Sequence, residues 1–163
     1  MGKEVFYPKT NNEIEFVMDW SVEKGGGVPP HLHKYMDEKF VITKGELKFK
    51  MNGKMLIKKE GEELLIPINT VHSVKNNFNG QSVALVTYSP STDTGKFFEI
   101  WSELDDLNPG RMSNMLKSLY IADKLELREF STPQPELIAK FIMFVIKRTA
   151  GLLGWRKLIK QFT

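Results

Sequence analysis

The stretch GGGVPPHLHKYMDEKFVITKG, residues 25–45, contains two of the three histidines in this 163-residue chain and determines how the fold is interpreted. His31 and His33 stand two positions apart, and in a strand such residues point to the same face. Glu38 then opens a run in which it shares one face with apolar Phe40. A carboxylate on an apolar face is costly unless it is paired or binds a metal. The stretch therefore predicts a buried cation site.

A second stretch, GEELLIPINTVHSVKN at residues 61–76, contains the remaining histidine, His72. A single histidine usually has no ligand role, so the argument depends on the residues around it. Glycine reaches positive φ angles and proline fixes a turn, so their positions report backbone geometry independently of the ligands. The two spacings are Gly25-x5-His31-x-His33-x4-Glu38-x6-Gly45 and Gly61-x5-Pro67-x-Asn69-x2-His72-x3-Asn76.

These spacings resemble the two motifs of the cupin family. The resemblance implies a mainly β fold, a cupin or jelly-roll antiparallel β-barrel with C-terminal α-helices. It also implies that His31, His33, Glu38 and His72 bind one metal ion inside the barrel. Asn69 stands where the motif usually has glycine. Because asparagine tolerates left-handed backbone better than other non-glycine residues, we expect the turn to survive.

The chain has no cysteine, which excludes disulfides, Cys-ligated zinc and a thiol nucleophile. Three imidazoles and one carboxylate suit one divalent transition metal: iron, manganese, nickel, copper, cobalt or zinc. The sequence does not select among these metals. An open position on such an ion can activate water or bind a chelating substrate.

The rest of the sequence fits a barrel followed by helices. Residues 14–88 form short alternating runs between turn residues, the pattern of an all-β domain. Asn52 and Gly53 predict a type I′ hairpin. After Pro90 the spacing becomes helical over residues 96–107, 112–127 and 136–162, with a break at 108–110. The chain then divides into a barrel, residues 1–92 with core motifs at 25–76, and a helical extension, residues 93–163, packed on the barrel or on a dimer partner.

We expect a small-molecule metalloenzyme, and the resemblance to quercetinase-like single-barrel cupins implies dioxygenase-like chemistry. Because a fold does not fix a function, the alternative is a non-catalytic binding or sensing module, whose metal anchors a ligand or stabilises the barrel. A free metal position beside a pocket would distinguish the two. The candidates to line such a pocket are Trp20, Tyr35, Met36 and Phe40.

The net charge of +3 conceals an asymmetry, because residues 137–163 carry +6 with no acidic residue and the rest of the chain sums to −3. Basic segments can bind nucleic acid or anionic lipid. The barrel region has no basic, aromatic-studded face, so no nucleic-acid partner is expected. The N-terminus shows no secretory signal, and a cytoplasmic location is the expectation.

The basic C-terminal segment also has a broad apolar stripe at helical spacing. We expect it to dock on its own protein or on a twin subunit, which would make a homodimer. A basic amphipathic helix can instead lie on a membrane, a less favoured interpretation because Gly151 and Gly154 would weaken an isolated helix. Charged residues interrupt the stripe too often for a transmembrane helix. The stripe consists of Leu137, Ile138, Phe141, Ile142, Val145 and Ile146, followed by Leu152, Leu153, Trp155, Leu158, Ile159 and Phe162.

Overall fold

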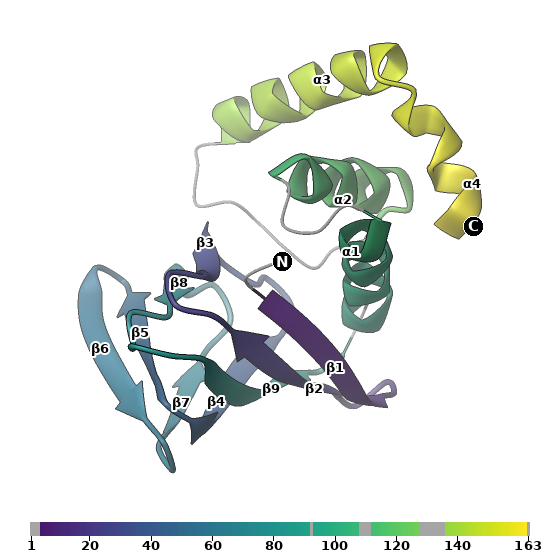
Figure 1. The fold of residues 1–163 in the computed structure, drawn as a ribbon. Helices are drawn as coiled ribbons and strands as arrows, with labels where there is room; N and C mark the ends of the chain where they lie inside the picture. Colours follow the sequence, from purple (N-terminus) through teal and green to yellow (C-terminus); the bar gives the residue numbers. More distant parts are fainter. Residues whose placement is uncertain (1–3, 92, 108–111, 128–135, 163) are drawn as a thin grey trace.

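The computed structural model describes residues 4–91, 93–107, 112–127 and 136–162. Two antiparallel sheets face each other and form a barrel (Figure 1). The larger sheet has the strand order β1-β2-β9-β4-β7, and the smaller one has the order β3-β8-β5-β6. The strands are β1 (Glu4–Asn11), β2 (Phe16–Val22), β3 (Gly27–His31), β4 (Asp37–Lys44), β5 (Glu46–Met51), β6 (Lys54–Lys59), β7 (Glu63–Ile66), β8 (His72–Lys75) and β9 (Ser82–Ser89).

Strict alternation of side chains builds the barrel interior. In β2 every second residue is buried, beginning with Phe16 and ending with Val22, and β9 repeats this pattern beside it. Successive side chains of a strand point to opposite faces, so such a pattern places one row in the core. The predicted all-β reading of this region is confirmed. Ile14, the first residue of the region predicted to alternate, lies before β2 and is exposed.

The predicted hairpin is also present. Asn52 and Gly53 have φ angles of 45° and 83° and connect β5 to β6. Positive φ at both central residues is what a type I′ turn requires, and its twist matches that of the flanking strands.

Strand β1 was not expected from the sequence. It pairs with β2 at the edge of the larger sheet, and its register shifts between Pro8 and Thr10. An edge strand tolerates proline because one side of it needs no hydrogen-bond donor. Val5 and Tyr7 face outward and are exposed, so this strand carries a weaker burial signal than its neighbours.

The helices are α1 (Thr94–Leu107), α2 (Met112–Lys124), α3 (Glu136–Leu152) and α4 (Ile159–Phe162), with a short 3-10 turn, η1 (Trp155–Lys157). The expected last helix is interrupted after α3, where Gly154 has a φ of 73°. The predicted break at 108–110 lies outside the described residues. Within the described part of the chain, no helix is both long and apolar enough to cross a membrane.

Helix α1 connects the barrel to the helical layer. Phe97 and Phe98 of α1 join the barrel core, whereas Ile100 and Leu104 face a second apolar cluster with α2 and the C-terminal elements. Helix α3 lies on the far side of α2 from the barrel (Figure 1). Of the stripe residues in α3, Ile146 is buried, but Leu137 and Phe141 are exposed. Within one chain, therefore, most of this part of the stripe does not dock on the barrel.

Candidate metal centre

The four candidate ligands come together from both sheets. His31 ends β3 and pairs directly with His72, the first residue of β8. Glu38 lies in β4 of the other sheet, between β7 and β9. His33 belongs to the connection between the sheets, beyond the end of β3. All four are buried.

The route by which His33 reaches the cluster differs from the expected one. The sequence argument placed His31 and His33 on one strand face, but the regular strand ends at His31. The carbonyl of His33 instead accepts a hydrogen bond of 2.7 Å from the backbone N–H of Asn69. Asn69 has a φ of 59°, the left-handed conformation expected of it. The turn that precedes His72 thus also fixes the backbone at His33.

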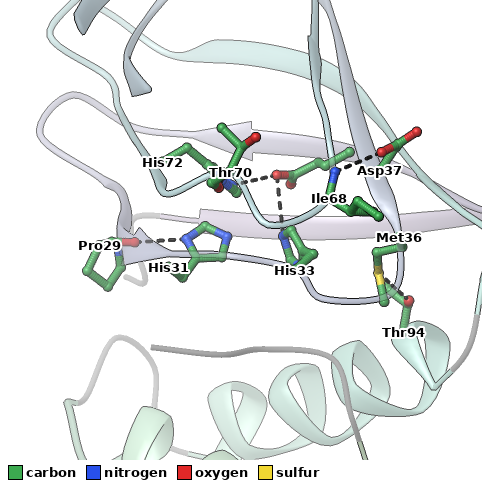
Figure 2. A network of polar contacts seen from close by, with 10 residues as sticks. Pro29, His31, His33, Met36, Asp37, Ile68, Thr70, His72 and Thr94 are labelled. Atoms are coloured by element: carbon green, nitrogen blue, oxygen red, sulfur yellow. Dashed lines mark hydrogen bonds and ion pairs between the residues drawn. The ribbon is translucent and has the colours of Figure 1, made fainter. Parts of the chain in front are cut away.

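The ligand atoms are close enough to share one ion, because all of them lie within 4.8 Å of one another. Nε2 of His72 is 2.8 Å from Oε2 of Glu38, and Nε2 of His33 is 3.5 Å from the same oxygen. The ring centroids of His31 and His72 are 4.1 Å apart. In Figure 2 the dashed lines from His33 and His72 meet at one carboxylate, that of Glu38.

Backbone carbonyls orient two of the imidazoles. In the neutral ring, Nδ1–H of His31 donates to the carbonyl of Pro29, and Nδ1–H of His72 donates to that of Thr70, both at 2.9 Å (Figure 2). A proton on Nδ1 leaves Nε2 as a lone-pair donor, the arrangement usual for metal-binding histidines. With the proton on Nδ1, the lone pair of His72 Nε2 faces Oε2 of Glu38 at 2.8 Å, and both atoms are buried without a hydrogen-bond partner, so a metal ion or a second proton on the ring would satisfy the contact. The residues therefore fit a single metal ion.

The electrostatics favour the deprotonated forms that a metal requires. Burial lowers the pKa of His31 to about 4, an effect that nearby Glu38 only partly offsets. Burial on its own would raise the pKa of Glu38, but the adjacent His33 and His72 outweigh it and hold that pKa well below its usual range. At neutral pH, His31 is thus uncharged and Glu38 is ionised.

A cavity of about 190 Å³ adjoins this cluster. Among the four ligand candidates, His31 and Glu38 line it. The other walls are overwhelmingly apolar and come from the barrel and from α1 and α2. They include Phe6, Met18, Trp20, Phe40, Tyr88, Phe97, Phe98, Trp101 and Leu119. An apolar pocket with few polar groups at one end is the usual form of a small-molecule site.

The structure separates the four residues predicted to line a pocket. Trp20 and Phe40 are in the cavity wall. Tyr35 is half exposed, and Met36 is buried where its Sδ accepts a 3.6 Å hydrogen bond from Thr94, the first residue of α1 (Figure 2). Neither Tyr35 nor Met36 is among the lining residues.

Sequence reasoning missed the part of the wall that the helices supply. Phe97, Phe98 and Trp101 follow one another at spacings of one and three residues, so all three can lie on the barrel-facing side of α1. Phe98 stacks against Phe16 of β2 with a centroid separation of 5.6 Å. The sequence spacing of these three aromatic residues could have identified them as one face of a helix. The sequence alone gave no indication that it faced the barrel.

A comparison with known protein families identifies the type of domain that the barrel forms. Residues 18–88 match the model of the cupin domain. The two antiparallel sheets are the double-stranded β-helix of that family, with helices added after it. The chain therefore contains a cupin domain, with a buried cluster of three histidines and one glutamate that could bind a metal. No curated protein sequence matches this chain significantly.

Solved structures support the same fold at low sequence identity. KdgF from a Halomonas species has 16% identity and a TM-score of 0.54, over 57% of this chain and 85% of that one. An RmlC-like cupin from Shewanella frigidimarina has 16% identity and a TM-score of 0.53, over 58% and 83%. The cupin domain of Cnp3 from Schizosaccharomyces pombe has 18% identity and a TM-score of 0.52, over 61% and 72%.

Proposed function

We propose that this protein is a metal-dependent cupin enzyme that acts, with dioxygenase-like chemistry, on a small and largely apolar substrate. One observation carries the proposal: the apolar cavity reaches the ligand cluster on the side formed by His31 and Glu38. A molecule in this cavity would approach the ion without displacing any of the four protein ligands. The open position that distinguishes a catalytic metal site from a structural one would then face the cavity.

The cavity size indicates the substrate class. An apolar cavity of about 150 Å³ is enough to admit benzene, and the volume here is about 190 Å³. The ring edges and faces of Trp20, Phe40 and Tyr88 would position a flat molecule between the barrel walls. The substrate class that fits is a single aromatic ring with oxygen substituents that can approach the ion.

Each part of the chain has a role in this proposal. His31, His33, Glu38 and His72 would hold one divalent metal, which when bound supplies Lewis-acid or redox chemistry at its open position. The backbone carbonyls of Pro29 and Thr70 keep two of the imidazoles in the required tautomer. The aromatic residues of α1 line the cavity and, with a substrate bound, would keep water out of it. Exclusion of water strengthens electrostatic interactions with a bound substrate.

The proposal is tested by metal analysis followed by turnover. Protein purified without added metal is measured by emission spectrometry, then reconstituted in turn with iron, manganese, nickel, copper, cobalt and zinc. Oxygen consumption is recorded with single-ring aromatic diols and hydroxyketones. We expect one metal per chain and turnover with at least one metal. Metal and ligand binding without turnover would instead support the non-catalytic binding module, and a failure to retain any of the metals would remove the site assignment.

A further inference from the structure

Helix α3 exposes a large apolar surface on the side that faces away from the rest of the molecule. At 3.6 residues per turn, Ala139, Met143, Ile146 and Ala150 fall on one side, and these residues are buried or partly buried. The opposite side is exposed, by 82% at Leu137, 66% at Phe141 and 89% at Leu152. The outer face, as we define it, consists of Leu137, Ile138, Phe141, Ile142, Phe144, Val145 and Leu152, and Leu153 extends it beyond the helix.

Two polar side chains, Arg148 and Thr149, lie on the same side of α3 as the outer face, and both make contacts within the helix. The hydroxyl of Thr149 donates to the carbonyls of Val145 and Ile146, at 3.0 and 3.1 Å. The guanidinium of Arg148 lies over the ring of Phe144, 5.3 Å from its centroid. A helix that is apolar on both sides is one that is covered on both sides. The inner side is covered by α1, α2 and η1, so the outer face calls for a partner.

The charges on and after α3 are almost all positive, and Glu136 at the start of the helix is the acidic exception. Residues 137–163 contain six lysines and arginines and no acidic residue. Lys147 is used internally, because its ammonium lies 2.9 Å from the carboxylate of Asp123 on α2. Arg148 lies over Phe144 of the outer face, the guanidinium of Arg156 lies near Gly151 of α3, and Lys157 and Lys160 are exposed on η1 and α4, which follow α3. An apolar face with Lys and Arg beside it is the pattern of a helix that lies in the interface of an anionic membrane.

A second copy of the chain fits this surface less well. If two α3 helices met through their outer faces, Arg148 would be desolvated in the contact, and the single acidic residue of α3 is Glu136, at the other end of the helix. At a membrane surface the same side chain can keep its stem among apolar groups and its charge among the lipid phosphates. The charge pattern therefore favours lipid over self-association through this face.

We propose that the outer face of α3 binds the surface of an anionic membrane, with the helix lying in the plane of the interface and the cupin barrel held above it. Figure 1 shows why this is feasible: α3 lies along the outside of the molecule, with α2 on the side towards the barrel. The contact does not involve the metal cluster or the cavity. The homodimer expected from the sequence stays a prediction, and any such dimer would use another surface.

The test uses the full-length chain and vesicle sedimentation. The vesicles are phosphatidylcholine alone, or an equimolar mixture with phosphatidylglycerol, at low and high sodium chloride. One variant combines Phe141→Ser and Leu152→Ser, and its control combines Met55→Ser and Ile57→Ser, two exposed apolar residues on β6 of the barrel. A second variant combines Arg156→Gln, Lys157→Gln and Lys160→Gln. Its control combines Lys44→Gln, Lys50→Gln and Lys54→Gln, which are exposed on the barrel.

We expect the unmodified chain to bind the anionic vesicles at least about tenfold more tightly than the neutral ones, and salt to weaken the binding. The variant of the outer face and the variant of the basic residues on η1 and α4 should each lose at least about tenfold in affinity, and neither control should. Equal binding to both vesicles, or no binding, would overturn the proposal. So would sedimentation equilibrium without lipid that shows a dimer which the Phe141→Ser and Leu152→Ser changes convert to monomers.

Discussion

Glu38 and His72 belong to opposite sheets, and their side chains meet at 2.8 Å between Oε2 and Nε2. This contact joins the two sheets through the candidate metal site.

Replacing Glu38 by glutamine keeps the volume of the side chain but removes its charge. We expect metal affinity to fall by at least about 100-fold, since even changes to residues behind the ligands weaken metal binding 10- to 100-fold. The measurement is a competition with a chelator. Glu63→Gln on β7, exposed and paired with Lys39 at 2.7 Å, is the matched control. Equal losses in both variants would contradict a role for Glu38 as ligand.

The pH dependence of metal-free stability follows from the same cluster. The pKa of His31 is about 4 in the folded chain and 6.5 in the unfolded one. The unfolded state therefore binds more protons between these values, so stability should rise with pH across that window and fall as pH drops from about 6.5 to about 4. The lowered pKa of Glu38 acts in the same direction at the acidic end, because its charge also stabilises the folded state.

The measurement is urea unfolding of metal-free protein at about pH 8, 6 and 5, and between the first and last of these the histidine alone should lower the free energy of unfolding by about 2 kcal/mol. The control is His31→Gln, which keeps a polar side chain but cannot titrate in this range. Its profile should be flatter than that of the unmodified chain. Parallel profiles for the two proteins would show that another group dominates.

Gly27 is predicted to be essential for the strand pairing that places His31 opposite His72. A Cβ atom at this position would lie 2.2 Å from the carbonyl oxygen of Val74 in β8, and the φ angle is 144°. We expect Gly27→Ala to destabilise the fold by at least about 3 kcal/mol, because backbone must move to relieve the contact. Gly61→Ala is the control: its φ is 82° with no atom within 4 Å of a Cβ, so it should cost only about 1 kcal/mol. Thermal melting distinguishes the two, and similar losses would mean that φ strain alone explains both.

Much of the site could be predicted because its signals are local. The spacing of His31, His33 and Glu38 predicted a cation site, and the resemblance to the cupin motifs added His72 as the fourth member of the cluster that the structure brings together. The tolerance of asparagine for left-handed backbone predicted the turn at Asn69, where φ is 59°. The turn at Asn69 depends on the backbone conformation of a few neighbouring residues, whereas the position of His33 depends on a hydrogen bond from the distant Asn69, which the strand argument did not include.

The features that could not be predicted depend on contacts between distant segments. β1 is an edge strand, and half of its side chains face outward, so its pattern gave little signal. The aromatic wall of the cavity comes from α1, whose orientation towards the barrel is a tertiary property. The C-terminal stripe indicated burial correctly only on its inner side, because helical periodicity shows where apolar residues lie but not which surface covers them.

Asn76, the last position of the second motif, is predicted to stabilise the fold without touching the metal site. Its side chain is fully buried and donates two hydrogen bonds of 2.8 Å, to the carbonyls of Val22 and Gly80. It also accepts one from the N–H of Phe78. Asn76→Ala leaves these buried groups without partners, and we expect a loss of about 2 to 4 kcal/mol. Metal affinity of the folded protein should not change.

Asn79→Ala is the control for this prediction, because Asn79 is exposed and accepts one hydrogen bond, from Lys24. It should change stability by less than about 0.5 kcal/mol. Chemical denaturation measures both variants. If Asn76→Ala instead weakened metal binding while leaving stability intact, Asn76 would have to be assigned to the site.

The two sides of α3 should respond oppositely to truncation. Ile146 is 5% exposed and packs in the cluster with Tyr120 and Trp155, whereas Phe141 is 66% exposed on the outer face. Ile146→Ala removes buried apolar volume and should destabilise the chain by about 2 to 4 kcal/mol. Phe141→Ala, although it removes a larger side chain, should change stability by less than about 0.5 kcal/mol in the absence of lipid. Urea unfolding without vesicles measures both. A loss at Phe141 as large as that at Ile146 would mean that the outer face is already covered in solution, and a dependence of that loss on protein concentration would identify a second copy as the cover.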